Sequence, residues 1–98
     1  MSEIHYDKLE VNQDIQKHVI QKVINERAHQ DHKWGVQRHS PELWMSILME
    51  EVGEAAKKVL EEKFSGYKSS GLYGELVQVA AVAIAILEQL EEERRGRA

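Results

Sequence analysis

Residues 76–87 constrain the fold more than any other part of this chain, because every position except Gln78 is apolar. On a helix, such a run places apolar side chains on all faces, which is typical of a helix buried on several sides. A chain of 98 residues has few other elements to surround it, and the absence of cysteine excludes disulfides and thiolate metal sites as reinforcement. We therefore expect this helix to be shared between the subunits of a homo-oligomer.

The same run must be compared with a membrane-spanning helix. Spanning needs about 20 apolar residues, and Glu75 and Glu88 bracket a shorter segment here. The first residues lack the basic and apolar regions of a secretory signal. A formal net charge of −4 argues against nucleic-acid binding, which usually depends on a basic face. We expect a cytoplasmic protein that binds neither membranes nor nucleic acid.

A first helix is expected at about 12–30, with Asn12 as its N-cap. Its apolar stripe at helical spacing consists of Ile15, Val19, Ile20, Val23 and Ile24. Residues 1–10 are polar and without a clear period, which predicts a flexible arm. Residues 29–39 are rich in His, Lys and Gln around Gly35, which predicts a connecting loop.

The tripeptide Ser40-Pro41-Glu42 marks the start of a second helix, at about 41–63. Serine is a favourable N-cap, proline is tolerated in the first turn, and an acidic side chain suits the positive end of the helix dipole. A turn-rich break separates this helix from a third at about 72–93. The predicted fold class is all-α: a single domain over residues 1–98, forming an antiparallel bundle of three main helices that is completed by oligomerisation.

Acidic residues interrupt the apolar face of the second helix. At 100° per residue its apolar arc consists of Ile47, Leu48, Val52, Ala55, Ala56 and Val59. Glu51 falls inside this arc, Glu54 lies at its edge, and Glu50 lies farther round the helix. Burying an ionised carboxylate without a partner costs several kcal/mol at the least. We therefore expect a metal ion or another cation beside Glu51.

The third helix supplies complementary oxygen ligands. Glu75 lies on the apolar stripe of this helix, and Gln78 lies one turn further on, at the edge of the stripe. If the second and third helices pack antiparallel, these two residues can face Glu51 and Glu54. A cluster of oxygen ligands without cysteine favours Mg²⁺, with Mn²⁺ as the alternative, over Zn²⁺.

The pattern Glu50-Glu51-x-x-Glu54, followed after twenty residues by Glu75-x-x-Gln78, resembles the E-E-x-x-E…E-x-x-D signature of the MazG-like all-α nucleoside triphosphate pyrophosphohydrolases. The upstream segment Trp34-Gly35-Val36-Gln37-Arg38-His39 is similar to one that precedes the signature in a MazG-like branch. The resemblance covers roughly residues 28–88. It implies a Mg²⁺-dependent nucleotide pyrophosphatase that cleaves a standard or modified (deoxy)nucleoside triphosphate to the monophosphate and pyrophosphate, in the house-cleaning of nucleotide pools.

The resemblance also implies roles for the acidic residues. Glu51, Glu54 and Glu75 would be metal ligands, and Glu50 would be an additional acid that bridges through water or positions and deprotonates the attacking water. Gln78 departs from the signature, which has Asp there. An amide oxygen can still bind a metal, but it carries no charge and cannot serve as a base. Gln78 is therefore a weak candidate ligand.

Substrate-binding residues are expected outside the acidic motif. The resemblance places Trp34, Gln37 and His39 at the nucleoside, whereas Trp44 is a predicted core residue. Lysines and arginines should contact the phosphates. The candidates are Lys57, Lys58, Lys68, Arg94, Arg95 and Arg97.

Other interpretations of these residues were open at the level of sequence. Glu26-x-x-His29 occurs once, whereas di-iron bundles need two such motifs, and His29 and His32 are more typical of a solvated face. A related substrate, phosphoribosyl-ATP, is processed in the same superfamily. A non-catalytic helical oligomer or antitoxin-like interaction module with a degenerate site is the alternative function. The resemblance favours a tetramer, built as a dimer of dimers, over a dimer.

Overall fold

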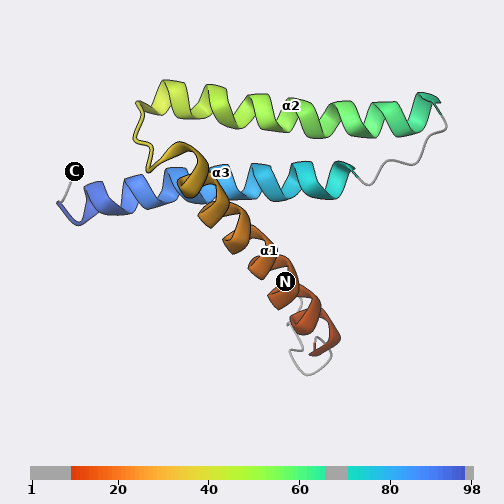
Figure 1. The fold of residues 1–98 in the computed structure, drawn as a ribbon, viewed down its shortest axis with the longest axis horizontal. Helices are drawn as coiled ribbons and strands as arrows, with labels where there is room; N and C mark the ends of the chain where they lie inside the picture. Colours follow the sequence, from red (N-terminus) through yellow and green to blue (C-terminus); the bar gives the residue numbers. More distant parts are fainter. Residues whose placement is uncertain (1–9, 66–70, 97–98) are drawn as a thin grey trace, which may run out of the picture.

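The computed structural model describes residues 10–65 and 71–96, and it contains three helices (Figure 1). They are α1 (Glu10–Trp34), α2 (Pro41–Ser65) and α3 (Gly71–Arg94). No strand occurs within these ranges. The all-α fold class is confirmed. Nearly all of the predicted arm, and most of the predicted break before α3, lie outside the described residues.

Helix α1 is longer than its sequence pattern predicted. It begins before Asn12, so the prediction of Asn12 as N-cap is wrong, and it continues through residues 29–34, which were predicted as a loop. This stretch contains neither Gly nor Pro, so nothing in it stops the helix. The helix ends at Gly35, which has a positive φ of 76° and donates its N–H to the Asp31 carbonyl at 2.9 Å. Residues 35–40, called the connector below, lead to α2.

Helix α2 begins where the sequence predicted. The Ser40 hydroxyl accepts a hydrogen bond from the Leu43 N–H at 3.3 Å, and Pro41 is the first helical residue. The helix continues to Ser65, two residues beyond the predicted end. The start of α2 is therefore determined locally, by its cap.

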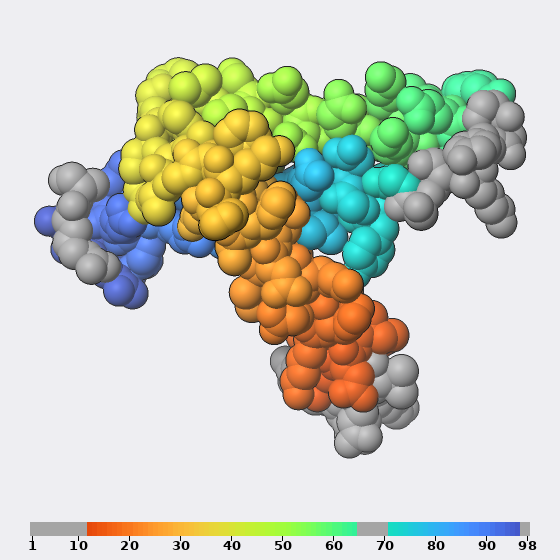
Figure 2. Space-filling view, viewed as in Figure 1, coloured from red at the N-terminus to blue at the C-terminus, as the bar shows by residue number. Residues whose placement is uncertain are grey.

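Helix α3 is the common partner of the other two helices. The chain runs along α2 and returns beside it in the opposite direction along α3 (Figure 1). Helix α1 crosses α3 at a steep angle, and its first half projects away from the pair (Figure 2). Within the described ranges α3 packs on both α1 and α2, whereas α1 and α2 have no close backbone contact with each other.

The apolar core is small. Trp44 is 4% exposed and packs with Val82 and Ala85, so the prediction of Trp44 as a core residue is confirmed. Large apolar side chains on all three helices remain exposed, among them Ile20, Met49 and Leu76. The radius of gyration is 16.6 Å, against about 13 Å for a compact chain of this length. The single chain therefore leaves much of its apolar surface uncovered.

Helix α3 is 24 residues long and is the only described helix that is long and apolar enough, by length and composition, to cross a membrane. Length therefore does not exclude a spanning helix, although the uninterrupted apolar run is shorter. The core helix of a soluble assembly has the same length and composition.

Candidate functional site

One cavity lies between the second half of α1, the connector, the first half of α2 and the middle of α3. Its volume is about 480 Å³, within the range of about 300–1,000 Å³ typical of small-molecule sites. Four predicted site residues line it: Trp34, Gln37, Glu50 and Glu51. The remaining lining residues are Arg27, Gln30, Asp31, Gly35, Trp44, Ile47, Val82 and Ala85. The cavity thus combines an aromatic and amide side with a carboxylate side.

Trp34 is exposed at the aromatic side of this cavity. Its side chain is 61% exposed, and the Lys33 ammonium lies 4.7 Å from the centre of its ring. An exposed indole at the edge of a cavity is suited to stacking on a flat ligand. Trp44, which lines the same cavity, is buried and is therefore a structural wall.

Glu51 is a half-buried carboxylate in unfavourable electrostatic surroundings. Burial raises the pKa of its carboxyl group above the ordinary value of 4.5. The negative charges of Glu75, Glu50, Glu54 and Glu26 raise this pKa further. These charges come from all three helices, so the fold gathers carboxylates around Glu51.

No lysine or arginine of the described chain forms an ion pair with Glu51, Glu54 or Glu75. Nor do any three described carboxylates or imidazoles lie close enough together to enclose a metal ion. Mg²⁺ does not require such a cage, because it usually binds through one or two carboxylates together with water and substrate phosphates. A half-buried Glu51 with further carboxylates within electrostatic range fits that mode of binding.

Other predicted residues lie outside the lining of the cavity. Glu54 is exposed and Glu75 is half-buried, and both act on Glu51 through their charge. Gln78 lines a different hollow, between α1 and α3, together with Glu26 and Lys22. His39 points toward Trp44, with the two ring centres 4.7 Å apart and the rings edge to face. Gln78 and His39 are therefore not among the residues that line the cavity, although His39 packs against Trp44, which is.

The described members of the predicted phosphate-binding set, Lys57, Lys58, Arg94 and Arg95, also lie outside the cavity lining. Lys57 is exposed, and Lys58 pairs with Glu61 at 3.7 Å. Arg94 and Arg95 both pair with Glu91, at 3.7 and 2.7 Å. Lys68 and Arg97 lie outside the described residues.

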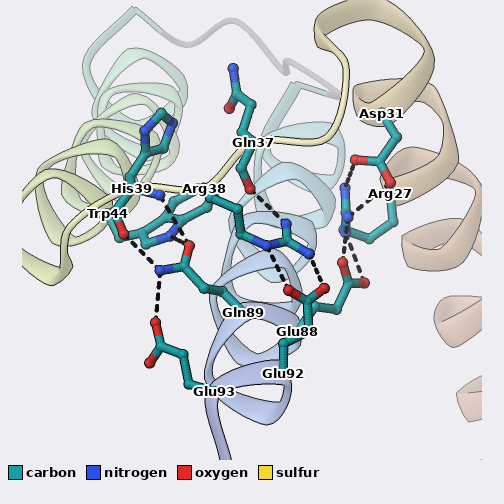
Figure 3. A network of polar contacts seen from close by, with 10 residues as sticks. All are labelled: Arg27, Asp31, Gln37, Arg38, His39, Trp44, Glu88, Gln89, Glu92 and Glu93. Atoms are coloured by element: carbon teal, nitrogen blue, oxygen red, sulfur yellow. Dashed lines mark hydrogen bonds and ion pairs between the residues drawn. The ribbon is translucent and has the colours of Figure 1, made fainter. Parts of the chain in front are cut away.

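The cation that does line the cavity is Arg27, which is only 9% exposed. Its guanidinium donates to Glu88 at 2.5 and 3.2 Å, to Asp31 at 2.9 and 3.1 Å, and to Gln30 at 3.4 Å (Figure 3). The hydrogen bonds to Glu88 raise the pKa of Arg27 most strongly. All of its N–H groups face these partners, so Arg27 joins α1 to α3 and is not available to a phosphate group.

A second polar network holds the connector on the C-terminal part of α3 (Figure 3). Arg38 forms a bidentate ion pair with Glu92, and it also donates to the Gln37 carbonyl at 2.7 Å. Gln89 hydrogen-bonds to the backbone of His39 and to the indole of Trp44. The connector is thereby attached to the helix that also packs on α1 and α2.

Sequence interpretation missed both networks, although each left a signal in the helical pattern. Arg27 follows Val19 and Val23 at steps of four residues, which places a charge in line with the apolar stripe of α1. Gln89 likewise follows Val82 and Ile86 on one face of α3. A polar residue on an apolar stripe needs hydrogen-bond partners. Some of these partners lie on the same helix, but Glu88 for Arg27, and His39 and Trp44 for Gln89, come from distant parts of the chain.

No protein-family model matches the chain, and no curated protein or solved structure matches it either. Function is therefore inferred from the residues that line the cavity. They provide two indoles, two carboxamides, three carboxylates and the guanidinium of Arg27. Asp31 pairs with Arg27, whereas the half-buried Glu51 lacks a cationic partner in the described chain. This is the chemistry of a site for a flat, anionic ligand that binds together with a divalent cation.

Proposed function

We propose that this chain is a Mg²⁺-dependent, MazG-like nucleoside triphosphate pyrophosphohydrolase of the cytoplasm. A water molecule would attack the α-phosphorus of the nucleotide, and the bond to the α,β-bridging oxygen would break. The products would be the nucleoside monophosphate and pyrophosphate. The observation that carries the proposal is that Glu51 and Trp34 line one cavity of suitable volume, although they come from different helices.

The four predicted site residues that line the cavity would have distinct parts in this reaction. Glu51 would hold Mg²⁺, with Mn²⁺ as a substitute, and the charged neighbours Glu54 and Glu75 would reinforce it. The cation offsets the negative charge of the triphosphate and of the leaving pyrophosphate. Glu50, which is exposed on the same side, would orient the attacking water. Trp34 and Gln37 would contact the nucleoside.

The decisive experiment is an assay of pyrophosphate release from a panel of nucleoside triphosphates with Mg²⁺, with phosphoribosyl-ATP included. We expect Glu51→Gln to lower kcat/KM by at least about a hundredfold, because loss of a charged metal ligand removes stabilisation of the transition state. Glu61→Gln is a matched control on the same helix, because Glu61 pairs with Lys58 away from the cavity. No release from any nucleotide, or equal rates for wild type and Glu51→Gln, would reject the proposal.

A second candidate is a non-catalytic helical interaction module. The large exposed apolar surface favours it, since a partner could cover this surface without any chemistry. In that case Gln78, in place of the signature Asp, would mark a degenerate site. The same assay separates the two candidates, because an interaction module releases no pyrophosphate.

We also propose that self-association completes the bundle, and that the unit is a tetramer rather than a dimer. The support is the small core, the exposed apolar residues on every helix and the large radius of gyration. Light scattering at micromolar concentration should give the mass of an oligomer. A monomer mass would contradict this proposal without affecting the assay of activity.

A further inference from the structure

Gln89 is a carboxamide with every hydrogen-bonding group in use. Its Oε1 accepts from the His39 N–H at 3.0 Å and from the Trp44 indole Nε1–H at 2.7 Å. Its Nε2 donates to the His39 carbonyl at 2.8 Å and to Glu93 Oε1 at 3.1 Å. Because both partners of Oε1 can only donate, the orientation of the amide is determined by its surroundings.

Gln89 holds the end of the connector through backbone hydrogen bonds, as a neighbouring β-strand would. One side chain satisfies both the N–H and the C=O of His39, a residue outside any helix. The same oxygen binds the buried Trp44, whose ring packs edge to face on His39 (Figure 3). Gln89 therefore joins the connector, α2 and α3 at one point.

The connector also forms part of the cavity wall. Gly35 and Gln37 line the cavity, and Trp34 immediately precedes them. The side chain of Gln37 points away from the polar network, whereas its carbonyl is bound by Arg38 (Figure 3). Any shift of the connector on α3 would thus move Gly35 and Gln37, which form the amide side of the cavity, whereas Trp34 is the last residue of helix α1. Glu50 and Glu51 belong to the continuous helix α2 and would stay in place.

We propose that Gln89 is a positioning residue for substrate binding: its carboxamide anchors the connector on α3 and so sets Gln37 at the cavity. This inference rests on the proposed function. It assigns Gln89 to the nucleoside side of the site and not to the phosphate chemistry. Loss of the anchor should therefore weaken substrate binding while leaving the turnover of bound substrate nearly unchanged.

The test compares Gln89→Leu with wild type in the pyrophosphate assay at varied nucleotide concentration. We expect KM to rise by about tenfold and kcat to stay within about twofold, because the nucleoside contacts are displaced but the carboxylates are not. Glu91→Gln is the matched control, since it removes ion pairs at the same end of α3 without touching the connector. This control should leave both constants unchanged.

A spectroscopic measurement accompanies the kinetics. In ¹H–¹⁵N spectra the indole N–H of Trp44 should exchange slowly with solvent in wild type, and quickly in Gln89→Leu. If Gln89→Leu loses its helical circular dichroism, Gln89→Glu takes its place. That variant keeps both accepted hydrogen bonds, loses the donation to the His39 carbonyl and faces the Glu93 carboxylate, so its KM should rise by a few-fold.

The role of Gln89 would be overturned if a folded Gln89 variant kept the KM of wild type. It would also be overturned if kcat fell as much as kcat/KM. Either result would leave the proposed function standing, because wild type would still be active. No pyrophosphate release by wild type would overturn both the function and this inference.

Discussion

The carboxylates on the two halves of α3 have opposite environments. Near its C-terminal end, Glu88 is bound by Arg27 and Glu92 is bound by Arg38. Near its N-terminal end, Glu75 lies within the electrostatic range of Glu51, and no described lysine or arginine pairs with it. One end is neutralised by the chain itself, whereas the other retains excess negative charge.

This difference separates structural charges from candidate functional ones. A protein that needed these acids only for solubility would place them on its exposed face, whereas Glu51 is half-buried at a cost to its ionisation. Perturbed carboxylates in a cavity are typical of functional sites. The three predictions below test this contrast, beginning with the largest effect on stability.

The first prediction concerns the neutralised end. Arg27→Leu should lower the free energy of unfolding by about 2–3 kcal/mol, because it removes a buried charge and leaves Glu88 and Asp31 without their partner. Urea denaturation followed by circular dichroism measures this loss. Arg38→Gln is the comparison, and it should lower the free energy of unfolding much less, since the Arg38 side chain is more exposed than that of Arg27. If the two variants lost the same free energy of unfolding, burial would not distinguish the two ion pairs.

The second prediction concerns the negatively charged end. Mg²⁺ with a non-hydrolysable α,β-imido triphosphate, each at about ten times its dissociation constant, should stabilise wild type by about 1.4 kcal/mol. Mg²⁺ alone should stabilise it far less, because the protein offers no closed cage of ligands within its described ranges. Thermal melting measures both effects. If Mg²⁺ and the analogue raised the melting temperature of Glu51→Gln as much as that of wild type, Glu51 would not hold the cation.

The third prediction, with the smallest effect, concerns pH. The pKa of Glu51 is raised in the folded state, so the folded chain binds the proton more tightly than the unfolded chain does. Stability should therefore fall as pH rises from the ordinary glutamate pKa of 4.5 through the raised value. Without metal, Glu51→Gln should melt above wild type at pH 7, and this advantage should vanish below about pH 4.

Glu61→Gln supplies the control for the pH experiment. It removes an ion pair with Lys58 on the same helix, so it should not raise the melting temperature at pH 7. If metal-free Glu51→Gln melted below wild type at pH 7, ionised Glu51 would have a favourable partner in the folded chain. The two ends of α3 would then not differ in the way described above.

Local sequence predicted those features that depend on neighbours along the chain. The existence of three helices and the cap at Ser40 followed from periodicity and capping, and the burial of Trp44 followed from its residue type. The end of α1 did not, because its polar last turns carry no apolar period even though they are helical. The partly buried position of Glu51 also followed from its place in an apolar arc.

The sequence by itself determined the helices and placed Glu51 on a buried face, because helical periodicity is a local property. Only the tertiary structure decided that Trp34 and Gln37 share a cavity with Glu51 while Gln78 and His39 do not. That choice depends on the crossing of α1 over α3 and on the contacts of Arg27 and Gln89. These contacts join residues about fifty to sixty positions apart, which no local pattern can specify.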